Sequence, residues 1–337
     1  MEDAERDEAR ERPVRTGGRR RRRALKITAG VVAVGVVAAA FGLRRPAPVG
    51  HWNGAAGRAD FMAAYDRAMK NMPPAARTID VRTDFGFVRV YRYEGRTGRK
   101  EPLVLLPGRA SASPVWADNM ARLLGIGDVY TIDLLGEPGK SVQDAPITSA
   151  ADQAAWLDQV LDRLPEESFH LVGLSIGGWT AANLAVRRAR HVASLILLDP
   201  VYTFSKIPAG TAIRAIPASV PWLPKSWRDS FNSYTAGGAP VEDVPVADMI
   251  ETGMRNYTLR LPQPGLVPAG SLRRLEMPVL AILAGESVMH DVAASRRRAE
   301  DVLQNGTVKV YPEASHAVNG EQPDRIAADI AAFLDGS

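Results

Sequence analysis

The sequence predicts an α/β fold in which helices cover both faces of a mostly parallel sheet and a helical insertion forms a cap. Short runs of Val, Ile and Leu alternate with segments whose apolar residues recur at helical spacing. This alternation is typical of parallel strands that are connected by helices. It stops between Val201 and Met277 and then resumes, so we expect one insertion in an otherwise continuous sheet.

The first predicted elements are a helix and an antiparallel pair of strands. Apolar residues recur at helical spacing from Phe61 to Met69, and the two prolines that follow end the helix. Two runs rich in β-branched and aromatic residues then flank a tight turn, which predicts an antiparallel edge to the sheet. The expected ranges are 59–72 for the helix and 78–82 and 87–93 for the strands.

The remaining elements follow the βα alternation. Strands are expected where apolar residues are continuous and bounded by polar or turn residues, and helices where they recur every three or four positions. The expected strands are 103–106, 129–133, 169–174, 192–198, 279–283 and 308–311. The expected helices are 114–124, 149–164, 176–188, 293–303 and 323–334.

The front of the chain differs from the rest in charge and hydropathy. Residues 1–26 hold ten Lys/Arg and six Asp/Glu, while the remaining chain has 32 of each sign. A basic body that holds nucleic acid is therefore not supported. Residues 27–43 are free of charge and approach the minimum length of a membrane span.

Two interpretations of the front stay open. Arginines before an apolar stretch favour an anchor whose amino end stays in the cytoplasm. The run Arg21-Arg22-Arg23-Ala24-Leu25-Lys26 also resembles a twin-arginine export signal, and Ala38-Ala39-Ala40 offers the small residues of a cleavage site. Either way the body is expected outside the cytoplasm, membrane-anchored or exported after signal cleavage. The predicted organisation is a polar basic tail (1–26), a transmembrane anchor or signal segment (27–43), a linker (44–57), a core (58–200 and 278–337) and a cap (201–277).

Composition and spacing exclude several kinds of site. The chain has no cysteine, which rules out disulfides, thiolate catalysis and Cys-based zinc sites. Its five histidines are scattered rather than clustered with carboxylates, so no metal site is predicted. Gly139-Lys140-Ser141 resembles the end of a phosphate-binding loop, but Leu134 stands where that motif needs its first glycine.

The strongest motif is Gly173-Leu174-Ser175-Ile176-Gly177, which fits G-x-S-x-G between a predicted strand and a predicted helix. A sharp turn at this place exposes the serine hydroxyl, and its glycines let the helix pack against the strand. Ser175 is therefore the predicted nucleophile. The backbone N–H of Ile176 and that of Arg109, in the loop after strand 103–106, are the predicted oxyanion donors.

His316 is the predicted general base. It follows the last strand, and its place after the serine and the acid agrees with the chain order Ser…acid…His. His170 and His191 stand near strand starts, at the wrong end of the sheet. His290 follows a late strand and is expected to line the pocket.

These features resemble an α/β-hydrolase carboxylesterase of the bacterial group named after naproxen esterase, over about residues 60–334. The resemblance rests on Thr83-Asp84-Phe85-Gly86, the loop 107–116, the segment 133–141, the serine turn and the His316 segment. It implies hydrolysis of carboxylic esters without a cofactor.

The sequence differs from this group at the position of the third catalytic residue. In Gly285-Glu286-Ser287-Val288 the usual acid position holds Val288 or, with one residue deleted, Ser287. Three carboxylates can substitute. Asp199 at the end of strand 192–198 is favoured on fold analogy and strand-end position, and Asp291 and Glu286 are the alternatives.

The expected function is hydrolysis of small esters with an apolar portion, through an acyl-enzyme on Ser175. Aromatic residues of the insertion are expected to supply an apolar pocket beside the serine. Two alternatives stay open: a non-catalytic protein that binds ligands in the cap pocket, and a perhydrolase or carbon–carbon hydrolase that uses the same serine.

Overall fold

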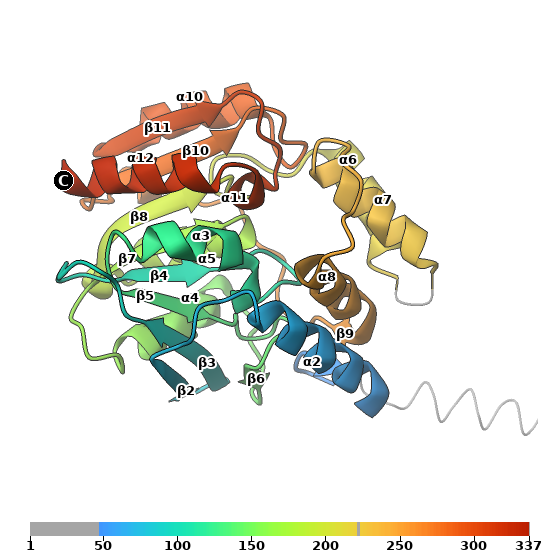
Figure 1. Cartoon of the computed structure of the whole chain (residues 1–337). Helices are drawn as coiled ribbons and strands as arrows, with labels where there is room; N and C mark the ends of the chain where they lie inside the picture. Colours follow the sequence, from blue (N-terminus) through green and yellow to red (C-terminus); the bar gives the residue numbers. More distant parts are fainter. Residues whose placement is uncertain (1–46, 221–222, 337) are drawn as a thin grey trace, which may run out of the picture. The chain divides into compact units, whose positions relative to one another are not determined.

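One mixed sheet forms the centre of the described chain, residues 47–220 and 223–336 of a computed structural model (Figure 1). Its strand order is β11-β10-β8-β7-β4-β5-β3-β2, with a short β6 paired to β3. Strands β11 to β5 are mutually parallel, and β3 runs antiparallel to both β5 and β2, so the predicted parallel sheet with an antiparallel edge is confirmed. The strands are β2 (Arg77–Thr83), β3 (Gly86–Tyr93), β4 (Leu103–Leu106), β5 (Val129–Ile132), β6 (Val142–Gln143), β7 (Phe169–Leu174), β8 (Val192–Leu198), β10 (Val279–Ala284) and β11 (Gly306–Tyr311).

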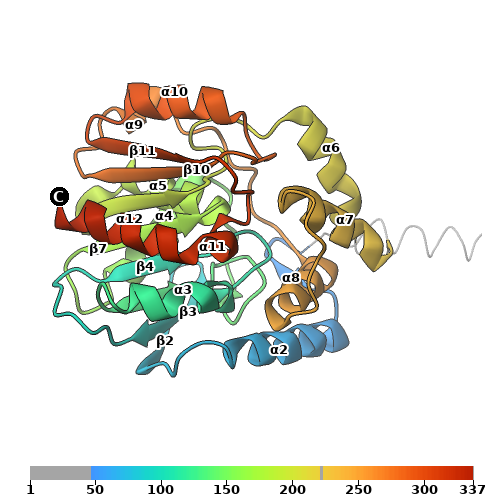
Figure 2. The ribbon, with the colours of Figure 1, turned by 45° about the horizontal axis from the view of Figure 1, so that its top comes forward.

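Helices cover both faces of this sheet (Figure 2). Alternate residues of β4 show why its run is continuously apolar: Leu103 and Leu105 pack into the core on one face, and Val104 and Leu106 into the core on the other. Helices α2, α3 and α12 contribute to the core that holds Leu103 and Leu105. Helices α4, α5 and α10 contribute to the core on the other face. The helices of the body are α2 (Ala55–Met69), α3 (Ala117–Leu123), α4 (Ala150–Leu161), α5 (Ile176–Ala185), α10 (Val292–Val302), α11 (Val318–Glu321) and α12 (Pro323–Asp335), with 3₁₀ turns η1 (Ser113–Trp116) and η2 (Ala189–His191).

The register of the central strands brings the ends of β7 and β8 together. Leu174 and Leu198 are paired across the two strands, so the residues that follow them, Ser175 and Asp199, leave the sheet side by side. The Ser175 N–H donates to the Leu198 carbonyl at 3.0 Å, and the Asp199 N–H donates to the Ile282 carbonyl of β10 at 2.8 Å. Backbone hydrogen bonds therefore hold both residues at the carboxyl edge of the sheet.

The insertion between β8 and β10 is mainly helical and lies beyond the carboxyl ends of the parallel strands (Figures 1 and 2). Its α8 also packs against the leading helix α2, where Arg255 and Asp60 form an ion pair at 3.2 Å. The predicted cap is therefore tied to the front of the body. Its elements are α6 (Ala209–Ala218), α7 (Lys225–Thr235), α8 (Pro245–Asn256), β9 (Tyr257–Thr258) and α9 (Ala269–Leu272).

Part of the predicted linker 44–57 forms regular structure. Strand β1 (His51–Trp52) pairs antiparallel with β9, and α2 already begins at Ala55. The ring of Trp52 packs against Phe61 and Tyr257, at centroid distances of 4.7 and 4.9 Å. A two-residue strand carries no periodicity, so burial of this aromatic ring against the cap, rather than a local pattern, orders the segment.

The predicted tail 1–26 and the apolar segment 27–43 lie outside the described residues. Within the ranges that the structure describes, no helix combines the length and apolar character needed to cross a membrane.

Candidate active site

Ser175 occupies a strained turn between β7 and α5, with φ 55° and ψ −116°. Such a backbone conformation is uncommon for a residue with a Cβ and is found where the surrounding structure enforces it. A Cβ on Gly173 would lie 2.5 Å from the backbone of Gly177, and one on Gly177 would lie 2.1 Å from the Leu106 carbonyl oxygen. Only glycine fits at either position, which explains the motif around the serine.

His316 reaches Ser175 from the loop after β11. Its Nε2 lies 2.8 Å from Ser175 Oγ, within hydrogen-bond distance. The loop is held by Ser315, whose N–H donates to Glu321 at 2.7 Å, and by the His316 N–H, which donates to the Thr235 carbonyl of α7 at 3.2 Å. The cap therefore helps to fix the position of the histidine.

Asp199 lies on the other side of the His316 ring, as the strand-end position predicts. Its Oδ2 is 2.5 Å from His316 Nδ1, and its side chain is fully buried. An ionised carboxylate can only accept, so Nδ1 carries the proton and Nε2 is free to accept from the serine hydroxyl. Burial raises the pKa of Asp199, but hydrogen bonds from His290 and His316 outweigh it and hold the pKa well below its usual range.

The alternative acids stand elsewhere. Asp291 is exposed and caps α10, where its Oδ1 accepts from the Ala294 N–H at 2.8 Å. Glu286 is also exposed. Ser287, one of the two residues that could stand at the usual acid position, donates its hydroxyl to Asp199 Oδ2 at 2.6 Å. The geometry therefore brings Asp199, and neither alternative, to the histidine.

The loop after β4 passes next to the serine. A Cβ on Gly108 would lie 3.7 Å from the Ser175 Cβ, and Arg109 and Ile176 line one narrow pocket together. Buried Glu137 holds this loop, because its Oε2 accepts from the Ala110 N–H at 3.1 Å and its Oε1 pairs with Arg109 Nη1 at 3.0 Å. Both predicted oxyanion donors thus belong to residues beside the nucleophile.

The contacts of three residues near the site were not predicted from the sequence: those of Glu137, Ser287 and His290. The Arg109 guanidinium pairs with Glu137, a buried residue in the segment 133–141. His290 does not line an open pocket as expected; its side chain is 1% exposed and its Nε2 lies 2.6 Å from Asp199 Oδ1. Burial lowers the pKa of His290. The hydrogen bond to Asp199 and the charge of Asp199 have a larger effect in the opposite direction, so the pKa lies above its usual value.

Two pockets contain apolar side chains. The pocket that Arg109 and Ile176 share is also lined by Leu134, Leu135 and Trp179. A separate groove lies between α6 and α7 of the cap, lined by aromatic and polar residues: Arg214, Pro217, Ser226, Trp227, Ser230, Phe231 and Tyr234. The first has a volume of only about 10 Å³, too small for a ligand, whereas the groove, at about 430 Å³, has the size of a ligand pocket.

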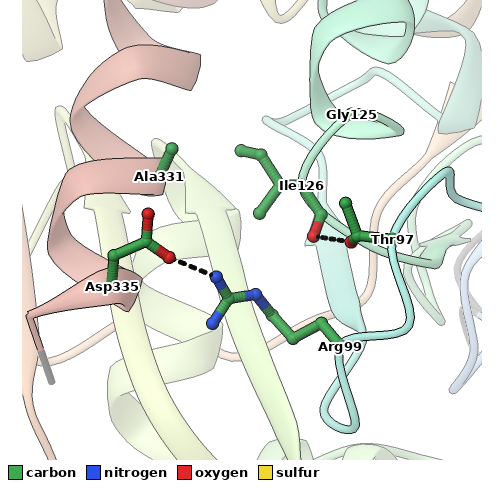
Figure 3. Close-up of a pocket in the computed structure, with 6 residues that line it drawn as sticks. All are labelled: Thr97, Arg99, Gly125, Ile126, Ala331 and Asp335. Carbon is green, nitrogen blue, oxygen red and sulfur yellow. Dashed lines mark hydrogen bonds and ion pairs between the residues drawn. The ribbon is translucent and has the colours of Figure 1, made fainter.

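A further depression lies at the opposite end of the sheet (Figure 3). It is formed by loops that precede β4 and β5 and by the end of α12. Its centre is crossed by Arg99, which donates to Asp335 at 2.6 Å and to the Leu334 carbonyl at 3.3 Å. This depression is thus spanned by an ion pair and is remote from the carboxyl ends of the strands, where ligands bind in open α/β sheets.

No group of three or more carboxylate or imidazole side chains in the described ranges is arranged to hold a metal ion. Ser175, His316 and Asp199 are joined by hydrogen bonds into one chain. A hydroxyl, an imidazole and a buried carboxylate in this order are the arrangement needed for a serine to lose its proton as it attacks an electrophile.

Comparison with known proteins agrees with this geometry. Residues 103–329 match the alpha/beta hydrolase family. The chain belongs to the α/β-hydrolase family. The predicted fold is that of this family, and the predicted resemblance to bacterial carboxylesterases is confirmed by individual relatives.

This α/β hydrolase is 24% identical to carboxylesterase YbfK of Bacillus subtilis, over 82% of the chain and 94% of the relative. It is 25% identical to a second, uncharacterised carboxylesterase of the same organism, nap, over 81% of the chain and 92% of the relative. The crystal structure of naproxen esterase from Bacillus subtilis superposes with a TM-score of 0.75, at 23% identity, over 82% of this chain and 97% of that one. The α/β hydrolase is thus related to carboxylesterases along most of its length.

Proposed function

We propose that this α/β hydrolase cleaves carboxylic esters through an acyl-enzyme intermediate on Ser175. The observation that carries the proposal is the continuous hydrogen-bonded chain from Ser175 Oγ to His316 (2.8 Å) and from His316 to Asp199 (2.5 Å). Carboxylesterase relatives along most of the chain support the same reaction class.

In the first half-reaction Ser175 Oγ forms a bond to the ester carbonyl carbon and gives its proton to His316 Nε2. Asp199, held ionised by its low pKa, stabilises the imidazolium that forms. When the tetrahedral intermediate collapses, the bond to the alcohol oxygen breaks and that oxygen takes the proton from His316. In the second half-reaction water, deprotonated by His316, attacks the acyl carbon, and the carboxylic acid leaves as Ser175 regains its proton.

The oxyanion of each intermediate is placed, in this proposal, against the backbone N–H groups of Ile176 and Arg109. Ile176 is the first residue of α5, and the N–H groups of a first helical turn have no acceptor within their own helix. Glu137 keeps the Arg109 loop in place through the Ala110 N–H. The Arg109 side chain is not required to touch the oxyanion.

The substrate class we propose is a small ester with an apolar portion. Leu134, Leu135 and Trp179 line the small cavity that Arg109 and Ile176 share, and in this proposal they contribute apolar surface to an acyl or alcohol group. The aromatic groove between α6 and α7 offers further apolar surface.

A fluorophosphonate probe and a panel of p-nitrophenyl esters of increasing chain length test the function. We expect the probe to label Ser175 covalently, the esters to be hydrolysed, and Ser175→Ala to abolish both. A folded wild-type protein that takes no label and hydrolyses no ester of the panel would instead favour a non-catalytic binding role.

We also propose that residues 27–43 are a membrane anchor or an export signal and that the body lies outside the cytoplasm. The support comes from the sequence: an uncharged apolar stretch directly follows a run of arginines.

A further inference from the structure

The carboxylate of Asp199 carries more hydrogen bonds than its contact with His316 requires. Its Oδ1 accepts from the Ala284 N–H at 2.9 Å and from His290 Nε2 at 2.6 Å. Its Oδ2 accepts from Ser287 Oγ at 2.6 Å and from His316 Nδ1 at 2.5 Å. One carboxylate therefore lies between two histidines, one on each oxygen.

Three of these four donors belong to β10 and the loop that follows it. This is the loop where the carboxylesterase group named after naproxen esterase was expected to place its acid, and it offers a hydroxyl and an imidazole instead. The proposed acid, Asp199, directly follows β8 and has φ 42° although it is not glycine. An acid displaced to the neighbouring strand thus depends on this loop for the donors that orient it.

His290 is placed to control the rotation of the carboxylate. Its side chain is 1% exposed, so its N–H···O bond to Asp199 is shielded from water, and it has no contact with Ser175 that would give it a direct part in the reaction. A turn of the carboxylate about its Cβ–Cγ bond that moves Oδ2 away from His316 also moves Oδ1 away from His290. The two histidines therefore fix one orientation between them.

We propose that His290 is a positioning residue that holds the Asp199 carboxylate with Oδ2 directed at His316. The inference rests on the proposed ester hydrolysis, for which His316 needs a correctly oriented acid. His290 acts only through Asp199 and touches neither the substrate nor the nucleophile.

A pair of amide variants tests this role. In His290→Gln the side-chain nitrogen can stand where Nε2 stands and still donate to Asp199, whereas the shorter Asn of His290→Asn ends near the Nδ1 position. We expect His290→Gln to keep kcat within about 3-fold of wild type. We expect His290→Asn to lower kcat about 10-fold with KM nearly unchanged, the scale on which outer-shell hydrogen-bond partners act. Equal kcat values for the two variants would overturn the proposal, because a mere space-filling role does not distinguish them.

A double-mutant cycle with Asp199→Asn gives a second readout. If His290 acts through the carboxylate, His290→Asn should lower kcat about 10-fold in the wild-type background and hardly at all in the Asp199→Asn background. A loss of the same size in both backgrounds would show that His290 acts on stability or elsewhere in the site. Thermal unfolding of each variant, together with titration of the active serine by a fluorophosphonate, corrects kcat for unfolded protein.

A measurement without substrate separates this inference from the proposed function. The proton between His316 Nδ1 and Asp199 Oδ2 should give a ¹H NMR resonance far downfield of the backbone amides, assigned by its loss in His316→Ala. We expect His290→Asn to shift or broaden it and His290→Gln to leave it in place. An unchanged resonance in His290→Asn contradicts the positioning role even if no ester is hydrolysed. A wild-type protein that shows the resonance but takes no fluorophosphonate label contradicts the hydrolase function alone.

Discussion

At the scale of single residues, the site is built on backbone positions that side chains seldom occupy. Among the described residues four other than glycine have positive φ: Ala110, Ser175, Asp199 and Tyr202. All four follow the carboxyl end of a strand, and three of them belong to the proposed oxyanion loop, nucleophile and acid. Strain of this kind persists only where packing enforces it, and it is concentrated at functional sites.

Ser175→Ala should abolish ester hydrolysis and leave the fold unchanged. Loss of such a nucleophile lowers kcat by about 10⁶-fold. Alanine keeps a Cβ at the same strained φ, so we expect the free energy of unfolding to change by less than about 1 kcal/mol. Turnover of a p-nitrophenyl ester and thermal unfolding check the two statements. Wild-type turnover by a pure Ser175→Ala preparation would contradict the assignment of the nucleophile.

Asp199→Asn should lower kcat by about 10⁴-fold, because the amide cannot stabilise the imidazolium as a carboxylate does. Asp291→Asn is the matched control. Asparagine also caps helices, so the variant should retain α10 and keep kcat within about 3-fold of wild type. The reverse result, a crippled Asp291→Asn beside a nearly normal Asp199→Asn, would place the acid on the later loop.

At the scale of elements, the neighbouring strands β7 and β8 end next to Ser175 and Asp199, and a buried histidine lies at their opposite end. His170 lies near the start of β7, where its Nδ1 is 2.8 Å from Ser194 Oγ of β8. Burial lowers the pKa of His170 to about 4, against about 6.5 in an unfolded chain. The strand pair that presents Ser175 and Asp199 therefore contains a group that resists protonation.

The sign of the resulting pH dependence follows from proton counts. Between pH 6.5 and 4 the unfolded chain binds a proton at His170 that the folded protein excludes. The contribution of His170 to the free energy of unfolding is therefore fully present above pH 6.5 and is lost as the pH falls toward 4. From pH 7 to pH 5 the free energy of unfolding should fall by about 2 kcal/mol because of His170.

His170→Asn, which keeps a polar partner for Ser194, should remove this loss. Chemical denaturation of both proteins at pH 7 and pH 5 measures it, because contributions from other groups, His290 included, cancel in the comparison. Parallel losses of stability in the two proteins would show that His170 is not the titrating group.

At the scale of the whole molecule, the described body begins just after the apolar segment. The first strand of the main sheet starts at Arg77, but β1 at His51–Trp52 already pairs with β9 of the cap. Ser175, His316 and Asp199 all belong to the unit that begins at Pro48, and the cap of this unit is joined to β1.

Removal of residues 1–43 should therefore yield a soluble enzyme with kcat within about 2-fold of the full chain, since the apolar segment precedes every element of the site. A shorter variant that starts at residue 55 is the control. It lacks Trp52 and the β1–β9 pair, and we expect it to unfold at a lower temperature. Activity and thermal unfolding of the two truncations are compared directly.

The location of the full chain is tested in cells. We expect it to fractionate with membranes or to be exported and trimmed. Recovery of the full-length protein from the soluble cytoplasmic fraction would contradict the targeting proposal.

Local patterns in the sequence were sufficient for the sheet, its flanking helices, the insertion and the two central site residues. Continuous apolar runs encode strands that are buried on both faces, and the glycines around Ser175 encode a turn that no larger residue fits. The position of His316 after the last strand then followed from chain order. Each of these features depends on neighbours in sequence or on the order of elements along the chain.

Tertiary structure decided what depends on distant residues. Three carboxylates were compatible with the sequence as acids, and only the register of β8 between β7 and β10 brings Asp199 to His316. The support of that acid by Ser287 and His290, the bracing of the oxyanion loop by Glu137, and the pairing of β1 with β9 join residues 27 to 207 positions apart. No local pattern records such contacts, because burial and hydrogen bonding across that separation exist only once the strands have assembled.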